Sequence, residues 1–455
     1  MGKLISVGLD VGTTTTQLIL SELTVENRGN AFSVPQMVID QREIRYQSPV
    51  IFTPLISGEL VDGQAIANWV DAQYLAAGIH KDQVDTGAVI ITGETSRKEN
   101  AKEVLNHLAG FAGDFVVATA GPDLESVLSA KGAGATEYSA KTGKTVLHMD
   151  IGGGTSNLSF IENGKIVRTG CLNVGGRLMK FNEKGKVTYL SPVLAGLTDL
   201  HLGDIPTERQ LQTITNQLVQ ALEMAAGLIP PTALLEKLTT KENAGHWQPE
   251  RAEVISFSGG VADCIEKDAP PFAYGDMGVL LGRAIRESSL CQSYRLGEQT
   301  IRATVIGAGC HSTQLSGSTV FYADVELPKK NLPVAVLSQP ITPESVKAAY
   351  AGQDAENVVL AISGSLSMNY EGIKALAQTL LAGSRGELLV CLESDMAKAL
   401  GHCIRLAEPS RSCLCIDGLY LENESFLDIG SPVGPALPVV IKTLVLSTEG
   451  KSGTG

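Results

Sequence analysis

Two aspartates in this sequence each stand at the end of an apolar stretch and directly before a glycine-rich turn. Asp10 precedes Val11-Gly12 and a run of threonines, and Asp150 precedes Ile151 and three glycines. A turn without bulky side chains presents backbone N–H groups, which can hold the phosphates of a nucleotide. A carboxylate there repels phosphate but suits a hydrated Mg²⁺ that the phosphates also bind. The pair therefore predicts a nucleotide–metal site.

The two turns are stronger evidence together than apart. Either turn alone has a structural explanation, because glycine-rich turns are common and aspartate caps turns by itself. Here the two Asp-x-Gly patterns match in plan, and a third pair, Gly259-Gly260, follows the apolar stretch that ends at Ser258. We expect the two aspartate turns to face each other from two domains and to clamp a nucleotide between them.

Other nucleotide motifs do not fit this sequence. A Walker motif around Gly143-Lys144-Thr145 needs a glycine at position 138, which is Tyr138. No G-x-G-x-x-G opens a helix after a strand, which disfavours a dinucleotide fold. Gly307-Ala308-Gly309 lacks the third glycine, yet with the glycine-rich residues 317–319 it forms a second candidate for the nucleotide wall. The sequence leaves this region and Gly259-Gly260 both open for that role.

The elements that must carry these turns alternate between strands and helices, which predicts an α/β protein. Apolar stretches predict strands at residues 3–9, 88–91, 145–151 and 253–258. Asn163-Gly164 lies between two β-like stretches and predicts a hairpin. Periodic leucines and isoleucines predict a helix over residues 208–226, which Thr207 and Gln210 can cap.

Composition bounds the class of protein. The chain has 455 residues, 48 of them glycine, and a net charge of −13 from 36 basic and 49 acidic residues. This balance is that of a globular protein, and it argues against binding to nucleic acid or to an anionic membrane, which need basic surfaces. No stretch is apolar enough to span a bilayer. The eight cysteines are widely spaced, so we expect reduced thiols and no zinc site.

The three turns resemble the phosphate-1, phosphate-2 and adenosine motifs of the actin, Hsp70 and sugar-kinase ATPase superfamily. Residues 125–134 resemble its first connecting helix, and residues 276–282 the second. The resemblance implies an actin-like (ribonuclease H-like) α/β fold with two lobes around a nucleotide cleft. The resemblance implies a first lobe over residues 1–145, with an extra segment near 22–90, and a second lobe over 146–297. It also implies a C-terminal α/β region over 298–446 that completes or extends the second lobe, and a disordered tail over 447–455.

The same resemblance assigns roles within the cleft, with ATP and Mg²⁺ as its ligands. Asp10 and Asp150 are the implied magnesium residues, and Glu125 is the implied residue that orients the attacking water. The resemblance also implies that the first turn contacts the phosphates through Gly12, Thr13, Thr14 and Thr15. The second turn is implied to contact them through Gly152, Gly153, Gly154 and Thr155. The implied contacts with the adenosine are Gly259 and Gly260.

A longer resemblance covers the whole chain. Residues 91–101, 148–157, 306–319 and 428–444 are similar to the reactivating factors of ethanolamine ammonia-lyase. This family implies a chaperone-like, slow ATPase that exchanges damaged cobalamin for adenosylcobalamin on the lyase holoenzyme, the adenosylcobalamin belonging to the partner enzyme. It also implies a cytoplasmic localisation, and more narrowly one within the ethanolamine-utilisation bacterial microcompartment. A small-molecule kinase and an actin-like filament protein are the alternatives, and the sequence does not fix the oligomeric state.

Overall fold

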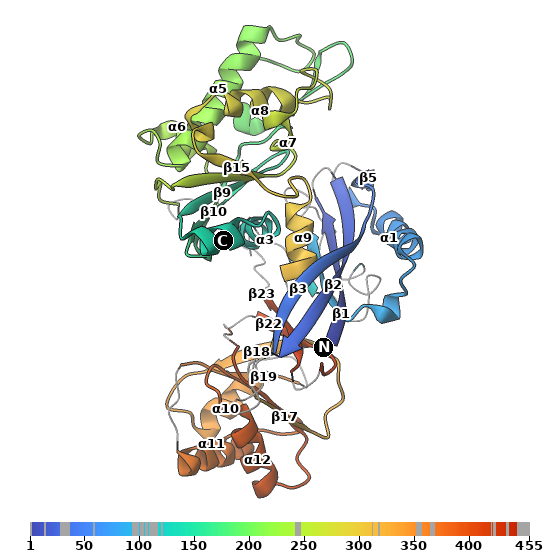
Figure 1. Ribbon diagram of the computed structural model, residues 1–455, viewed down its shortest axis with the longest axis vertical. Coiled ribbons are helices and arrows are strands. Elements are labelled where there is room, and N and C mark those ends of the chain that lie inside the picture. The colour runs from blue at the N-terminus through green and yellow to red at the C-terminus, as the bar shows by residue number, and fades with distance from the viewer. Residues whose placement is uncertain are drawn as a thin grey trace, which may run out of the picture.

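The chain folds into three bodies that follow one another along the longest axis of the molecule (Figure 1). The computed structural model describes residues 2–12, 15–27, 37–57, 60–92, 100, 104, 108, 117–119, 122–241, 247–311, 313–316, 319–351, 357–364, 369–419, 421, 425–433 and 436–443. The predicted tail, 447–455, lies outside these ranges. In Figure 1 the blue first lobe is in the middle, the green and yellow second lobe above it, and the orange and red C-terminal body below.

The first lobe is a mixed sheet in the order β3-β2-β1-β7-β8, with β4 also paired to β2. The pairs β1–β2 and β2–β3 are antiparallel, whereas β1–β7 and β7–β8 are parallel. Helix α1 packs its apolar side on the sheet through Ile66, Val70 and Tyr74. The bounds are β1 Gly2–Val11, β2 Thr15–Asn27, β3 Met37–Gln47, β4 Ile51–Phe52, β5 Leu55–Ser57, β6 Leu60–Val61, α1 Gly63–Ala77, β7 Thr86–Ile91 and β8 Val117–Thr119.

The second lobe repeats this topology. Its main sheet runs β11-β10-β9-β14-β15, with the first two pairs antiparallel and the last two parallel, strand for strand as in the first lobe. The bounds are α4 Ala135–Thr142, β9 Val146–Ile151, β10 Ser156–Glu162, β11 Lys165–Leu172, β12 Met179–Phe181, β13 Val187–Leu190, α5 Glu208–Ala225, α6 Ala233–Leu238, β14 Val254–Ser258, α7 Asp263–Glu266, α8 Gly278–Arg286 and β15 Tyr294–Leu296. This duplicated two-lobe α/β arrangement is the actin-like ATPase fold, and the predicted fold class is confirmed.

Two local predictions in the second lobe are confirmed by the backbone. Asn163 and Gly164 join β10 to β11 with φ angles of 48° and 79°, as a two-residue hairpin turn of this kind requires. Helix α5 begins with a capping box in which Thr207 accepts from the Gln210 N–H and Gln210 accepts from the Thr207 N–H. Short-range signals were sufficient for both.

The C-terminal body differs from the expected extension of the second lobe, because it forms a sheet of its own. Its strands run β16-β23-β22-β18-β19-β20-β21-β17, with a parallel run from β18 to β21. It meets the first lobe: Val433 packs with Leu4 and Val25, and the hydroxyl oxygens of Thr86 and Thr313 lie 2.7 Å apart. The bounds are β16 Thr313–Leu315, β17 Val320–Ala323, β18 Lys329–Leu337, α10 Pro343–Ala351, β19 Val359–Ile362, α11 Tyr370–Gly383, β20 Leu388–Leu392, α12 Ala397–Ala407, β21 Cys413–Ile416, β22 Ser425–Ile429 and β23 Pro438–Thr443.

Two helices cross where the lobes meet: α3 (Pro122–Gly132) and α9 (Ala303–His311), side by side in Figure 1. Each follows the last strand of one lobe and packs on the sheet of the other, α3 on β10 and β11, α9 on β1 and β2. A Cβ atom added to Gly132 would lie 1.8 Å from the Ala303 carbonyl oxygen, and one added to Gly307 2.0 Å from that of Leu128. Glycine at these positions lets the two backbones touch.

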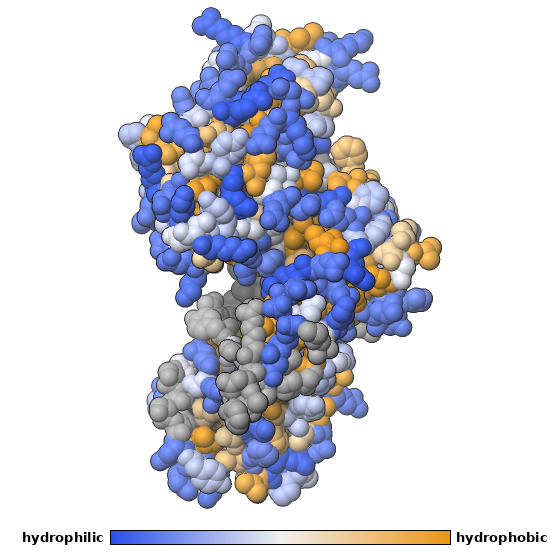
Figure 2. Space-filling view, viewed as in Figure 1, coloured by the Kyte–Doolittle hydropathy of each residue, from blue (hydrophilic) through white to orange (hydrophobic). Residues whose placement is uncertain are grey.

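The viewed face of the molecule is largely hydrophilic, with separate apolar patches (Figure 2). Within the described ranges, no helix is both long enough and apolar enough to cross a membrane. Most buried apolar side chains lie in the cores of the three bodies, and two small apolar clusters join α3 and α9 to the first-lobe sheet.

The glycine contact between α3 and α9 predicts an unusual sign for a helix substitution. Alanine in place of glycine normally stabilises a helix by about 1 kcal/mol. At Gly307 the added methyl group meets the backbone of Leu128, which has no side chain to move, so Gly307→Ala should lose about 1–3 kcal/mol instead. The melting temperature of the purified variant measures this. A melting temperature above that of the wild type would contradict the contact.

Candidate functional site

The two aspartate turns are closed by the same backbone hydrogen bond in the two lobes. The Gly12 N–H donates to the Thr15 carbonyl oxygen over 2.9 Å, and the Gly152 N–H donates to that of Thr155 over 2.9 Å. On the neighbouring strand Asp10 is paired with Gln17, and Asp150 with Asn157. The matched spacing seen in the sequence thus reflects a repeated hairpin.

Asp10 is 7% exposed and lies at the end of β1. The Thr92 hydroxyl donates to its Oδ1 atom over 3.0 Å. Burial raises the pKa of Asp10 to about 7; hydrogen bonds from Thr92 and Gln17 oppose the rise, and the charge of Asp150 adds to it. The repulsion shows that the structure brings the two carboxylates into one electrostatic site, although 140 residues separate them in the chain.

Asp150 is 6% exposed and stands at the head of a buried polar chain. The Ser258 hydroxyl donates to its Oδ1 atom over 2.5 Å, and Thr304 of α9 donates to its Oδ2 atom over 3.4 Å. Burial raises the pKa of Asp150 to about 6, against these two hydrogen bonds. Thr304 places the first turn of a crossing helix directly on the carboxylate.

His148 continues this chain behind Ser258. Its Nε2 atom lies 2.9 Å from the Ser258 hydroxyl and its Nδ1 atom 3.2 Å from that of Ser256. Burial lowers the pKa of His148 to about 3, so the ring is neutral. Since the Ser258 proton goes to Asp150, Nε2 must carry the ring proton and donate to Ser258, while Nδ1 accepts from Ser256. The chain thus fixes the orientation of the Asp150 carboxylate.

Two amide side chains complete the site, and the sequence-based prediction missed both. Gln17 Oε1 and Asn157 Oδ1 are buried and have no hydrogen-bond partner among the described residues. Each belongs to the residue opposite an aspartate, so the two oxygens occupy equivalent places in the two lobes. The sequence did contain a signal for these two residues, because each amide follows its aspartate by seven positions. A buried oxygen without a donor calls for a ligand, since leaving it unpaired costs free energy.

The turn glycines divide into two kinds. Gly12 and Gly152 use their N–H groups to close the turns, whereas the N–H groups of Gly153 and Gly154 donate to no described residue. A Cβ added to Gly154 or Gly260 would meet nothing within 4 Å, so open space adjoins both. Gly259 has a φ of 87° and lies against the Ile151 backbone, which requires glycine. Thr13 and Thr14 lie outside the described residues.

The structure separates the two candidates for the nucleotide wall. Gly259-Gly260 follows β14 beside the Asp150 turn, where the Val261 N–H donates to the Ile151 carbonyl oxygen. Gly307-Ala308-Gly309 lies inside helix α9 and is buried against α3 and β1, so it serves helix packing. Residues 317–318 lie outside the described ranges.

The assignment of residues 276–282 as the second connecting helix is wrong. Residues 278–282 form the start of α8, and residues 276–277 lie in the loop before it. Helix α8 packs on α5 and α7 inside the second lobe, whereas α9 makes the crossing. Glu125 stands half-buried in the first turn of α3, the other crossing helix. The neighbouring Ser126 is buried and donates to the Gly170 carbonyl oxygen over 3.4 Å, which anchors this turn on the second lobe.

Arg177 links the turns of both lobes. Its backbone N–H donates to the Gly153 carbonyl oxygen over 2.6 Å. Its guanidinium lies 5.7 Å from the centre of the Phe52 ring, and Phe52 pairs with Thr15 of the first turn. Its Nε atom donates over 2.9 Å to Asp276, which is 7% exposed on its side chain and also accepts from the N–H of residue 278.

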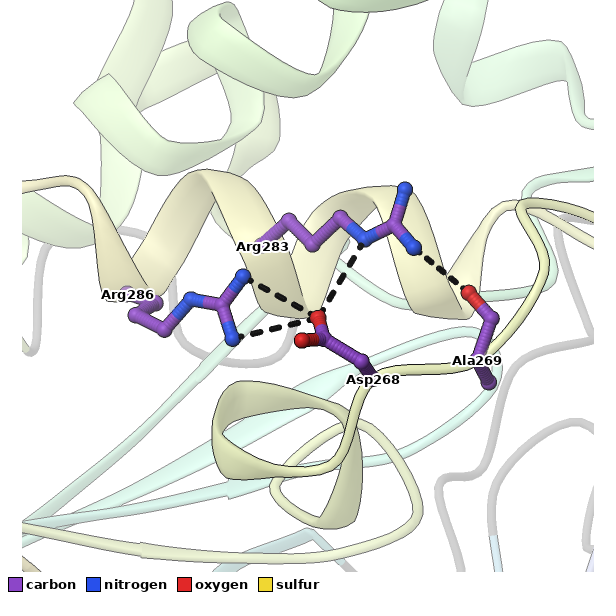
Figure 3. Close-up of polar contacts among 4 residues, drawn as sticks. All are labelled: Asp268, Ala269, Arg283 and Arg286. Atoms are coloured by element: carbon purple, nitrogen blue, oxygen red, sulfur yellow. Dashed lines mark hydrogen bonds and ion pairs between the residues drawn. The ribbon is translucent and has the colours of Figure 1, made fainter.

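The loop that carries Asp276 is held on α8 by two further arginines (Figure 3). Arg286 donates through both terminal nitrogens to Asp268 Oδ1 over 3.3 Å, and Arg283 donates to the Ala269 carbonyl oxygen over 2.6 Å. The Asp268 side chain is 76% exposed, so its ion pairs contribute little to stability. The buried pair of Arg177 and Asp276 is the stronger link.

This set of groups fits a hydrated Mg²⁺ with nucleotide phosphates. Within the described ranges, no group of three or more histidine, cysteine, aspartate or glutamate side chains could enclose a metal ion. Mg²⁺ does not need such a cage, because it keeps several waters and takes one or two carboxylates together with substrate phosphates. Two carboxylates, two unpartnered amide oxygens and open N–H groups are a donor set of this kind.

Fold and site together define a protein with the duplicated two-lobe fold of actin-like proteins and one buried carboxylate on each lobe. Over residues 2–447 the chain matches the family model described as ethanolamine utilisation protein EutA. It is similar to the ethanolamine ammonia-lyase reactivase EutA of Salmonella typhimurium, with 37% identity over 97% of this chain and 98% of the relative. The same-named protein of Escherichia coli is 36% identical over the same shares. The chain belongs to the EutA family.

Solved structures with a similar course of the chain are more distant. An Aquifex aeolicus member of the Ppx/GppA family matches with a TM-score of 0.41 and 12% identity, over 67% of this chain and 97% of that one. The ethanolamine utilization protein EutJ from Carboxydothermus hydrogenoformans matches with a TM-score of 0.32 and 18% identity, over 68% and 90% of the two chains.

The two aspartates predict a pH dependence of the stability of the ligand-free protein. Folding raises their pKa values from 3.8 to about 7 and about 6, so the folded protein keeps protons that the unfolded chain has released. Their contribution to stability is complete below about pH 4 and is lost as the pH rises through 6 and 7. Asp10→Asn removes one such group. Its melting temperature in EDTA should exceed that of the wild type by several degrees at about pH 8 and approach it at about pH 4.

Asp82→Asn is the matched control, because the Asp82 side chain is 82% exposed. This control should follow the wild type at every pH. A difference between Asp10→Asn and the wild type that does not change with pH would contradict the raised pKa of Asp10.

The two kinds of ion pair in the α7–α8 loop predict unequal effects of removing an arginine. Arg177→Ala leaves the buried Asp276 without its cationic partner and should destabilise the protein by about 2–4 kcal/mol. Arg286→Ala leaves the exposed Asp268 in water and should cost less than about 1 kcal/mol. Chemical denaturation of both variants measures the difference, and equal effects would refute the distinction.

Proposed function

We propose that this chain is an ATP-dependent reactivating factor for ethanolamine ammonia-lyase. The observation that carries the proposal is the pair of buried carboxylates on matching turns of two lobes, in a chain of the EutA family. Two relatives that match nearly its whole length bear the name ethanolamine ammonia-lyase reactivase. The partner is the inactivated lyase holoenzyme, and the adenosylcobalamin that replaces damaged cobalamin belongs to that partner.

The turns bind the phosphates of ATP in this proposal. The open N–H groups of Gly153 and Gly154 donate to phosphate oxygens, and Gly152 shapes the turn that presents them. Gly12 does the same for the first turn. Gly259-Gly260 leaves room for the adenosine. The threonines of the two turns add hydroxyl donors: Thr13, Thr14, Thr15 and Thr155.

The acidic and amide side chains serve the metal and the water. Asp10 and Asp150 would hold Mg²⁺, and the unpartnered oxygens of Gln17 and Asn157 could accept hydrogen bonds from its waters. When bound, magnesium would neutralise charge on the phosphates during hydrolysis. Ser258 and Thr304 keep the Asp150 carboxylate directed at this place. Glu125 orients the attacking water and accepts its proton.

Nucleotide binding is converted into a change of lobe angle through the crossing helices. Thr304 touches Asp150 from the first turn of α9, while α9 as a whole packs on the first lobe. A nucleotide that draws the two turns together therefore also moves α9 and α3. Hydrolysis is slow because it resets this switch and is not itself the reaction that the partner needs. Segment 22–90 and the body after residue 298 are the candidate surfaces for gripping the lyase, in the cytoplasm and in the ethanolamine-utilisation microcompartment.

Reactivation of cyanocobalamin-blocked ethanolamine ammonia-lyase with ATP, Mg²⁺ and adenosylcobalamin tests the proposal. Wild-type protein should restore lyase activity only when all three are present. Asp150→Asn and Asp10→Asn should each lower the rate of ATP-dependent reactivation by about 100-fold, because the nucleotide–metal complex loses a carboxylate ligand. Asp82→Asn, on the exposed surface, should keep the wild-type rate.

Full reactivation by both cleft variants would refute the assignment of the site. Failure of the wild type to reactivate the lyase, combined with ATP-dependent phosphorylation of a sugar, would instead identify the kinase alternative. ATP-dependent sedimentation as long polymers would identify the filament alternative.

A further inference from the structure

A basic hollow lies at the end of the crossing helices away from the aspartates. It consists of two adjoining cavities of about 550 Å³ and about 350 Å³, which share Lys131, Glu137 and His311 in their walls. Thr304, in the first turn of α9, touches Asp150, and His311 is the last residue of the same helix. Seven residues of α-helix span about 10 Å, so the hollow and the aspartate site lie at opposite ends of α9.

The charge of the hollow is opposite to that of the chain. Its walls carry six cationic side chains and two carboxylates, Glu137 and Glu298, in a protein of net charge −13. Of the cations only Arg168 forms an ion pair with a described residue, Glu250, which lies outside the walls. The six come from β3, α3, α4, β11 and β15, and therefore from both lobes: Arg42, Lys131, Lys141, Lys165, Arg168 and Arg295.

The cations are held close enough to repel one another. Burial lowers the pKa of Lys131, and the neighbouring charge of Arg42 lowers it further, against the attraction of Glu137. Burial likewise lowers the pKa of His311 to about 3, with Arg42 and Lys131 adding to the effect. Arg42 is fixed in place because its Nε atom donates to the Cys310 carbonyl oxygen over 2.8 Å.

Stabilisation of helix ends explains only part of this arrangement. Lys131, Lys141 and His311 stand in the last turns of α3, α4 and α9, where cations interact favourably with the helix dipole. Arg42 lies on strand β3 of the first lobe and Lys165 on strand β11 of the second, and neither ends a helix. The concentration of cations from two lobes needs a further cause.

We propose that this hollow binds a small multivalent phosphate compound that bridges the two lobes behind the crossing helices. The charge of the walls matches an anion of several negative charges, and each cavity has the size of a small-molecule site. Helix α4 contributes its first turn, since Gly134, Thr136 and Glu137 line the hollow and the N-cap Gly134 makes no side-chain cap. Free N–H groups at such a helix start are donors for phosphate oxygens.

Calorimetric titration with inorganic tripolyphosphate in EDTA tests the site. Without magnesium the cleft presents two carboxylates and disfavours phosphate, so binding reports on the hollow. The wild type should bind one tripolyphosphate per chain, more tightly than inorganic phosphate and more weakly as salt rises. The double variant Arg42→Gln, Lys131→Gln should bind at least about tenfold more weakly, because each lost cation removes a charged hydrogen bond.

Lys184→Gln is the matched control, as Lys184 is an exposed lysine of the turn between β12 and β13. It should bind tripolyphosphate as the wild type does. Equal affinity in the double variant, or no binding by the wild type at millimolar concentration, would overturn the proposal.

The melting temperature of the ligand-free variants supplies the second measurement. Lys131→Gln removes the cost of burying the ammonium charge and its repulsion from Arg42, and should melt no lower than the wild type. If Lys131 served only to stabilise the end of α3, Lys131→Gln should melt lower than the wild type. A clear fall in its melting temperature would therefore assign the residue a structural role and refute the site.

Discussion

Two carboxylates of like charge, each more than nine-tenths buried and each on a different lobe, are the constraint around which the cleft is arranged. Burial and mutual repulsion make their charged forms costly, and hydrogen bonds from Thr92, Ser258 and Thr304 offset only part of that cost. In the proposed function, a divalent cation with its phosphates removes the repulsion and links the two lobes. The nucleotide–metal complex would then favour a closure that the ligand-free protein resists at neutral pH.

The duplicated topology makes this constraint symmetrical. Asp10 and Asp150 occupy the same register in the same strand of two similar sheets, with an amide side chain opposite each. The crossing helices break the symmetry, because Thr304 of α9 reaches Asp150 while its helix packs on the sheet of Asp10. Close glycine contacts between α3 and α9 leave little room for one helix to slide alone. We therefore expect a movement at one aspartate to be transmitted to both lobes.

How well the sequence predicted a feature depends on how far apart in the chain its interacting residues lie. The aspartate turns, the Asn163-Gly164 hairpin and the α5 capping box are local patterns, and each is found where expected. The roles of Gln17 and Asn157 follow from cross-strand pairing, which only the repeated seven-residue interval hints at. Gly307-Ala308-Gly309 was ambiguous because glycine serves tight turns and close helix packing alike. The separate C-terminal sheet pairs β16 with β23 over more than a hundred residues, beyond any local signal.

The distribution of charge ties the two ends of the crossing helices together. The aspartate site concentrates negative charge and, in the proposed function, accepts phosphate only together with a cation, whereas the hollow concentrates positive charge and is proposed to accept phosphate directly. Arg42 approaches the hollow from the first lobe and Lys165 from the second, so an anion bound there would hold the lobes at one angle. In the proposed function, the nucleotide would set the lobe angle from the other end of the helices. Two ligands that favour different positions of one pair of helices must change each other's affinity by the same factor, whichever binds first.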